Sequence, residues 1–364
     1  MNGEIPEYIP QYNMMGWLVN PGMFQRTTTP EGYTKDEYGI LYTTTEESMG
    51  AGMPVPGIVF LDDITKWRDK VKIPDISHID WEKLAKKDLA NRDPEHNPVV
   101  ISYGDIFIML VNMMSFTEAM FAMHEEPEEV YELFDTLTKY YLEVEKNMLK
   151  HYNPDCYCIL DDTAAANFPF ISVDMYQRLV KPFHKAVADL ALNAGLKISM
   201  HCCGKCECFI DDWIDIGVSA WEPAQAANDL LGIKKKYGRK MAIMGGWDNL
   251  NHASRLDASE EELEAELIKY VDTFAPDGGF AIICCDGRSP ESVGCSKYDL
   301  TCLLLDLNMG ITDAMHFDGG GSVAVYIKDG EDFSLRNIPS GPPRQPEKRG
   351  QLRPVADIIA VVLD

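Results

Sequence analysis

Four cysteines and one histidine fall within residues 199–209, in the sequence SMHCCGKCECF. Thiols and imidazoles are ligands of zinc, and a pair of thiols can also carry out redox chemistry. The stretch follows an apolar run that predicts a strand, so it lies where that strand ends. Four interpretations are open: a redox dithiol, a closed structural zinc site, an open catalytic zinc site, or small buried residues without a metal.

The spacing of the residues distinguishes these alternatives. Cys203 and Cys206 form a C-x-x-C motif, but a thioredoxin-type motif belongs at a helix N-terminus in a much smaller fold. A four-cysteine site would need Cys284 and Cys285 as well, and adjacent residues of a strand point to opposite faces. His201 and Cys203 lie two residues apart on an extended backbone, so their side chains face the same way. One later cysteine would complete three ligands and leave a zinc position open for catalysis.

We predict Cys285 as that third ligand. It lies near the C-terminal end of the predicted strand 280–286, directly before Asp286, whereas Cys284 would face the helix layer. Ends of other predicted strands carry acids. We consider Asp162, Glu222 and Asp248 as catalytic candidates, acting as proton donors or as partners of His201, with solvent-facing caps as the alternative; Asp161 is a further acid of this kind.

Alternating strands and helices must position these residues. Apolar, β-branched runs predict strands at 98–104, 156–162, 196–203, 219–223, 241–248, 280–286 and 313–320. Helical spacing predicts helices at 125–152, 173–195 and 259–274, the last with a serine cap and a glutamate three residues later. This order predicts an α/β fold, a (β/α)8 TIM-barrel-like arrangement with chemistry at the C-terminal strand ends; closure by the C-terminal segment is left open.

Composition restricts the function classes. The 364 residues carry a formal net charge of −25, which disfavours nucleic acid and anionic membrane surfaces as partners. The first residues lack the pattern of a signal peptide, and no apolar run has the length of a membrane span. All ten cysteines fall between Cys156 and Cys302. This clustering indicates reduced thiols kept near one place, and we expect a cytoplasmic protein.

Residues 5–280, most clearly 155–280, resemble the uroporphyrinogen decarboxylase superfamily, whose fold is a (β/α)8 barrel. The landmarks are the Asp-Asp strand end at 161–162, ISVDMY with VKPF on the next helix, HCCG, DIGVSA, and KKYG with MAIMGGWD. Its decarboxylases bind a carboxylated tetrapyrrole through many arginines. Only six arginines precede position 280, namely Arg26, Arg68, Arg92, Arg178, Arg239 and Arg255. So few arginines disfavour binding of a carboxylated tetrapyrrole by this chain.

The other branch of the superfamily consists of corrinoid-dependent methyltransferases, with zinc held by H-x-C-G and one late cysteine. His201-x-Cys203-Gly204 matches this motif, with Cys285 or Cys284 as the late cysteine. The resemblance implies a zinc-dependent methyltransferase that moves a methyl group between a corrinoid (cobalamin) protein and a small-molecule donor or acceptor. The alternative is a decarboxylase of the uroporphyrinogen type.

Residues 280–364 resemble the C-terminal part of phosphodiester glycosidases, through DGR, FDGGGS, RNIPS and RPVADII. We therefore divide the chain into a barrel at 1–279 and a C-terminal segment at 280–364 that packs onto the barrel or completes it. The glycine-rich turn exposes backbone N–H groups suited to a phosphate or a sugar, although a plain strand-to-strand turn is the alternative. The candidate phosphate- or sugar-binding residues are Asp286, Arg288, Asp318, Gly320 and Ser322. A non-catalytic or phosphosugar-binding barrel is therefore a third possible function.

Overall fold

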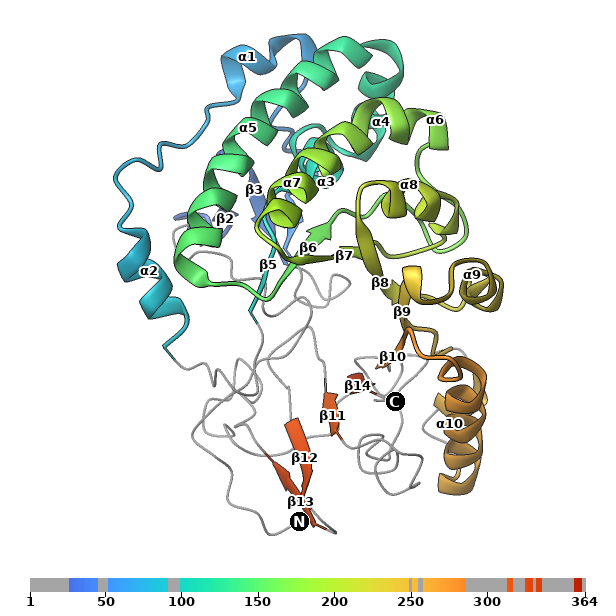
Figure 1. The fold of residues 1–364 in the computed structure, drawn as a ribbon. Helices are drawn as coiled ribbons and strands as arrows, with labels where there is room; N and C mark the ends of the chain where they lie inside the picture. Colours follow the sequence, from blue (N-terminus) through green and yellow to red (C-terminus); the bar gives the residue numbers. More distant parts are fainter. Residues whose placement is uncertain are drawn as a thin grey trace. The chain divides into compact units, whose positions relative to one another are not determined.

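The structure is a computed structural model that describes residues 26–44, 52–90, 99–248, 251–254, 258–285, 313–316, 325–329, 332–335 and 357–361. The chain divides into two compact units. The first unit holds Leu18–Ala90 and Val99–Val218, and the second is formed mainly by Ser219–Asp364. Figure 1 shows the helices and strands of the chain, coloured along the sequence.

The first unit begins with a small antiparallel sheet in the order β1-β2-β3-β4. Its strands are short: β1 Thr27–Thr28, β2 Thr34–Lys35, β3 Leu41–Thr43 and β4 Met53–Pro54. Three helical segments follow it, η2 Ile64–Lys66, α1 Trp67–Lys70 and α2 Trp81–Asp88. Asp36 holds the turn between β2 and β3, because one of its carboxylate oxygens accepts the backbone N–H groups of residues 38, 39 and 40.

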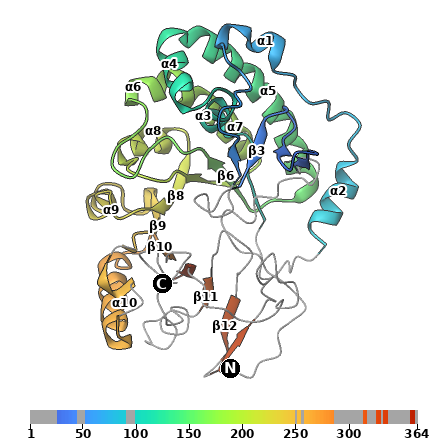
Figure 2. The same ribbon diagram turned by 180° about the vertical axis from the view of Figure 1, so that it is seen from behind.

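Three parallel strands form the centre of the first unit, in the order β7-β6-β5. They are β5 Val100–Ile101, β6 Cys156–Leu160 and β7 Lys197–His201. The helices around them are α3 Ile106–Met114, α4 Phe116–Glu125, α5 Pro127–Tyr152, α6 Val173–Met175, η3 Tyr176–Val180, α7 Lys181–Asn193, η4 Glu207–Phe209 and α8 Ile210–Asp215. Helix α7 packs on β6 and β7, and α5 lies against α7 on the outer side (Figures 1 and 2).

The two long predicted helices have the expected ends. Helix α5 begins at Pro127, where a missing N–H costs nothing. The helix predicted at 173–195 runs from α6 to Asn193, and Gly195 follows it with a φ of +87°. Its second turn, η3, is a π-helix. Pro182 follows shortly afterwards and has no N–H to donate to the carbonyl four residues earlier. The regular α-helical hydrogen bonds are therefore interrupted at this turn.

The second unit contains β8 Val218–Ala224, β9 Ala242–Gly245 and β10 Phe280–Cys285 as neighbouring parallel strands. Its helices are α9 Leu230–Tyr237, η5 Gly238–Lys240, η6 His252–Ser254 and α10 Glu260–Phe274. Helix α10 has the predicted capping box of Ser259 and Glu262. The Tyr270 hydroxyl of α10 donates to the Gly245 carbonyl over 2.5 Å and so ties this helix to the end of β9.

The C-terminal strands differ from the expected parallel order. They are β11 Asp313–His316, β12 Val325–Asp329, β13 Asp332–Leu335 and β14 Asp357–Val361. Strand β14 lies between β10 and β11 and pairs antiparallel with both, and β12 and β13 continue antiparallel beyond β11. A strand from the end of the chain therefore separates the strands that correspond to the two predicted at 280–286 and 313–320.

Parallel strands alternating with helices confirm the predicted α/β class. Closure into a barrel and the boundary between residues 279 and 280 stay predictions. Among the described helices, none alone combines the length and apolar character of a membrane span; α3 and α4, bent by 112°, meet both criteria only as a pair.

Candidate metal centre

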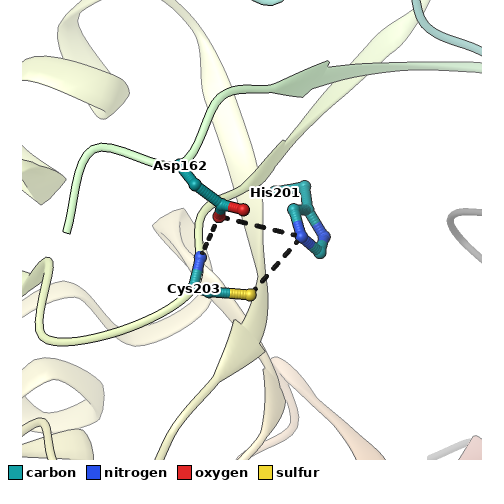
Figure 3. A group of neighbouring side chains, drawn as sticks. All are labelled: Asp162, His201 and Cys203. Carbon is teal, nitrogen blue, oxygen red and sulfur yellow. Dashed lines mark hydrogen bonds and ion pairs between the residues drawn. The ribbon is translucent and has the colours of Figure 1, made fainter. Parts of the chain in front are cut away.

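Three potential ligands meet where β6 and β7 end in the first unit (Figure 3). Asp162 lies two residues after β6, His201 is the last residue of β7, and Cys203 lies two residues further. The Cys203 Sγ is 3.6 Å from the His201 Nε2, and this nitrogen is 3.9 Å from the Asp162 Oδ1. The same Asp162 oxygen accepts the Cys203 backbone N–H over 2.6 Å.

Side-chain alternation after β7 explains this convergence. His201 and Cys203 point to one side, as their spacing predicts, and Cys202 between them points to the other. The buried Cys202 Sγ accepts the backbone N–H of Thr163 over 3.5 Å, in the loop after β6. The Asp161 N–H also donates to the His201 carbonyl over 3.0 Å, which extends the ladder beyond the two strands. The backbone thus holds the two strand ends in register.

The charge state of Cys203 depends on its surroundings. Its side chain is half-buried, and burial is the main cause that raises the pKa of its thiol. His201 lowers this pKa, whereas the negative charge of Asp162 raises it further. Without a bound metal ion, the thiol therefore keeps its proton. A metal ligand must be a thiolate, so binding of a cation here releases that proton.

The distance between His201 and Cys203 fits a zinc ion. With zinc bonds of about 2.3 Å to sulfur and about 2.1 Å to nitrogen at a tetrahedral angle, the two ligand atoms would lie about 3.6 Å apart. The separation in the structure is 3.6 Å. The three donor atoms all lie within 4.8 Å of one another. A carboxylate oxygen, an imidazole nitrogen and a thiolate sulfur leave a fourth position for a substrate.

Comparison with protein families agrees with this fold. The family model described as uroporphyrinogen decarboxylase (URO-D) matches residues 55–284. The chain belongs to the uroporphyrinogen decarboxylase family. The model described as phosphodiester glycosidase matches residues 274–362. Both matches confirm the resemblances stated from the sequence motifs, and the chain has the fold of an enzyme family.

A solved structure described as a methyltransferase from Methanosarcina mazei is similar to this uroporphyrinogen decarboxylase family member. The TM-score is 0.48 and the sequence identity is 14%, over 80% of this chain and 90% of that chain. No curated protein matches the chain.

The other predicted site residues of this family member lie in the second unit. Cys285 is the last residue of β10, in agreement with its predicted place at a strand end. Glu222 is buried within β8, and Asp248 is exposed three residues after β9. Their roles stay predictions. The candidate phosphate- or sugar-binding residues Asp286, Arg288, Asp318, Gly320 and Ser322 lie outside the described residues.

The remaining thiols of the cysteine-rich stretch do not favour redox chemistry. Six cysteines form no disulfide, namely Cys156, Cys158, Cys202, Cys203, Cys206 and Cys208. The buried Cys206 Sγ lies 3.4 Å from the Cys202 carbonyl oxygen and 3.6 Å from that of Gly204, with which it makes hydrogen bonds. Burial raises the pKa of Cys206, and neighbouring thiols raise it further. A reactive dithiol needs the opposite, an accessible thiol of lowered pKa.

Asp161, next to the candidate ligand Asp162, has a structural role that the sequence did not identify. Its carboxylate accepts the backbone N–H groups of Phe107 and Ile108, over 2.9 and 3.0 Å, and thereby caps helix α3. The His184 Nε2 lies 2.9 Å from the same carboxylate, and the other nitrogen of this ring is 3.0 Å from the Tyr176 hydroxyl. The sequence signal available was the Asp-Asp pair itself, because adjacent residues of an extended chain face different environments.

Gly204, the residue after Cys203, packs closely against the backbone of Ala165. Its φ is +87°, and a Cβ at this position would lie 2.4 Å from the Ala165 carbonyl oxygen, which accepts the Lys205 N–H over 2.8 Å. We expect Gly204→Ala to lose about 2–4 kcal/mol of unfolding free energy, because a backbone clash adds to the left-handed strain. Gly195→Ala is the matched control, with the same φ and no atom within 4 Å of its Cβ. Urea unfolding compares the two, and equal losses would contradict the clash.

Proposed function

We propose that this protein is a zinc-dependent methyltransferase that moves a methyl group between a corrinoid protein and a small-molecule donor or acceptor. The observation that carries the proposal is the separation of 3.6 Å between the His201 Nε2 and the Cys203 Sγ, with the Asp162 carboxylate beside them. Both residues belong to the H-x-C-G motif, which the sequence resemblance links to the methyltransferase branch of the family.

His201 and Cys203 would hold the zinc ion, with Asp162 or the predicted Cys285 as a further ligand. When bound, zinc supplies Lewis acidity that lowers the pKa of a substrate thiol or polarises the leaving atom of a methyl donor. Asp162 has a second task in either case. Its hydrogen bond to the Cys203 N–H fixes the backbone that carries the thiol. The open side of the site must then admit both the small molecule and the corrinoid, which we assign to a separate protein.

The positions of the described arginines support this choice over decarboxylation of a polycarboxylate. Arg68 pairs with Glu129 and Glu132, and Arg178 pairs with Asp174. Arg239 donates to the Asp277 carbonyl. These are three of the four described arginines before position 280, and each is already engaged by the protein itself. The fourth, Arg26, lies over the Tyr42 ring.

Metal analysis and methyl transfer test the proposal together. We expect about one zinc ion per chain in the purified full-length protein, lost in His201→Ala and Cys203→Ala. Cys208→Ser is the matched control, because this thiol is exposed in the same stretch and should leave the zinc content unchanged. Methyl transfer is followed by the absorbance change between cob(I)alamin and methylcobalamin, and should disappear with the zinc.

Two results would contradict the proposal. One is a folded protein, produced with zinc in the medium, that contains no zinc. The other is stepwise loss of acetate carboxylates from uroporphyrinogen, which would assign the chain to the decarboxylases of its family.

A further inference from the structure

A second feature of the first unit is a cavity of about 210 Å³ between the small antiparallel sheet, the end of β6 and the start of α3. Leu160, the last residue of β6, contributes to its wall, two positions before Asp162. The cavity therefore adjoins the strand end that carries the candidate metal centre. Its lining is acidic, with three carboxylates (Asp36, Glu37 and Asp105) and one guanidinium (Arg26).

The three carboxylates are engaged to different extents. Both carboxylate oxygens of Asp36 are hydrogen-bonded. One accepts three backbone N–H groups, and the other accepts the Tyr42 hydroxyl over 2.9 Å. Glu37 accepts the Tyr103 hydroxyl over 3.2 Å through one oxygen. Burial raises the pKa of Glu37, while its own backbone N–H, the Tyr103 hydroxyl and the Arg26 charge lower it.

Asp105 differs from both. It occupies the N-cap position of α3, yet its side chain makes no capping hydrogen bond. The reason is that Asp161 already accepts the N–H groups of Phe107 and Ile108. The Asp105 carboxylate lines the cavity instead. Burial, and then the charge of Asp161, raises its pKa to about 7.

Aromatic side chains complete the lining. Tyr42, Tyr103 and Tyr141 contribute to it, and the rings of the last two meet edge-on with centroids 5.3 Å apart. The buried Tyr141 hydroxyl makes no hydrogen bond of normal geometry among the described residues, and the Tyr38 hydroxyl lies near it. The Arg26 guanidinium lies 3.4 Å from the centre of the Tyr42 ring. One cation thus already stacks on an aromatic face of this cavity.

We propose that the cavity is a subsite for a small organic ammonium group, held by the Asp105 and Glu37 carboxylates and by the tyrosines. A cation would be attracted by the half-buried Asp105 and Glu37 carboxylates, whereas an anion would meet three carboxylates and one guanidinium. Tyrosine faces suit an ammonium group because it is weakly hydrated when substituted, and the volume limits the ligand to a small molecule.

The ammonium group is one part of the substrate. For the part that reacts, the inference rests on the proposed function. A protonated or quaternary nitrogen has no lone pair for zinc, so in a zinc-assisted transfer the ammonium group anchors the substrate and another atom binds the metal. The reacting atom is then a heteroatom a few bonds away, in reach of the neighbouring strand end. A thiol is the heteroatom that best suits a zinc site with a cysteine ligand. The substrate class is a small aminothiol or its S-methyl derivative.

Four probes of one length test the subsite on the zinc-loaded full chain by calorimetry. They are 2-aminoethanethiol, 2-aminoethanol, 2-mercaptoethanol and 2-mercaptoethanesulfonate. We expect 2-aminoethanethiol to bind about tenfold or more tightly than 2-mercaptoethanol, and the sulfonate to bind weakest. Asp105→Asn and Glu37→Gln should each remove most of this preference without changing the zinc content. Asp174→Asn, an exposed site with the same change of charge, should leave it intact.

The outcomes separate the subsite from the metal chemistry. Binding of 2-aminoethanol to metal-stripped protein, lost in Asp105→Asn, supports the subsite whatever the zinc content is. A chain that binds zinc but prefers the sulfonate, or whose preference survives both substitutions, overturns the subsite and leaves the proposed function standing. Glu37→Gln keeps the test valid if Asp105→Asn does not fold, because glutamine can still accept the Tyr103 hydroxyl.

Discussion

Asp161→Asn is expected to lower the free energy of unfolding by about 3–5 kcal/mol, the usual cost of breaking a buried charged network. One carboxylate oxygen accepts from Phe107 N and lies against the His184 ring, and the other accepts from Ile108 N. Asparagine offers only one acceptor. In either orientation its NH2 group faces a backbone N–H of α3, and a buried donor is left unsatisfied. Urea unfolding followed by circular dichroism measures the loss.

Asp189→Asn is the control for this substitution. Asp189 lies on α7, the helix that carries His184, and forms an exposed ion pair with Lys185 one turn away. Its loss should cost no more than about 0.5 kcal/mol. Comparable losses in the two variants would contradict the assigned role of Asp161. In the Asp161→Asn variant, Asp162 should still lie beside Cys203 in every folded molecule. The amount of zinc bound should therefore be proportional to the fraction of molecules that are folded.

Glu145→Leu is expected to stabilise the protein by about 3 kcal/mol at pH 7. Glu145 lies on α5 with a fully buried side chain, and neither carboxylate oxygen has a hydrogen-bond partner among the described residues. Burial raises its pKa from 4.5 to about 9. The folded protein must therefore keep a proton that the unfolded chain loses. Leucine fills the site without this cost.

The same pKa shift predicts a pH dependence. The folded-state pKa is the higher one, so the contribution of Glu145 to stability is full below about pH 4.5 and is lost progressively up to about pH 9. The loss is about 1.4 kcal/mol per pH unit within this window. Glu145→Gln should remove this slope, whereas Glu143→Gln, an exposed neighbour on α5, should preserve it. An unchanged slope in Glu145→Gln would show that the carboxyl is ionised in the fold.

The regular part of the fold was predictable because its signals are local. Helix α10 follows from a serine three residues before a glutamate, and α5 from a proline followed by helical spacing. The segment 106–125 was missed, because α3 and α4 are apolar on several sides and show no clear period. The strands of the small sheet have two or three residues each, too few for alternation to be recognised.

The candidate site was predictable where one strand supplies it. His201 and Cys203 follow from their spacing, because alternation is a property of the backbone alone. The contribution of Asp162 depends on which strand lies beside β7 and in which register, and neither is encoded in a local pattern. The antiparallel β14 between β10 and β11 was missed for the same reason, because its pairing joins segments about 40 to 80 residues apart.

Asp161 and Asp162 are consecutive, yet one fixes helix α3 and the other lies against Cys203. Selection can therefore act on the two positions independently. In a saturation library sorted for cellular abundance, position 161 would tolerate few residues, while position 162 would vary more freely until the library is sorted again for turnover. New specificities could arise through exchanges at position 162 and in the loop behind it, on a scaffold whose integrity depends on the preceding residue.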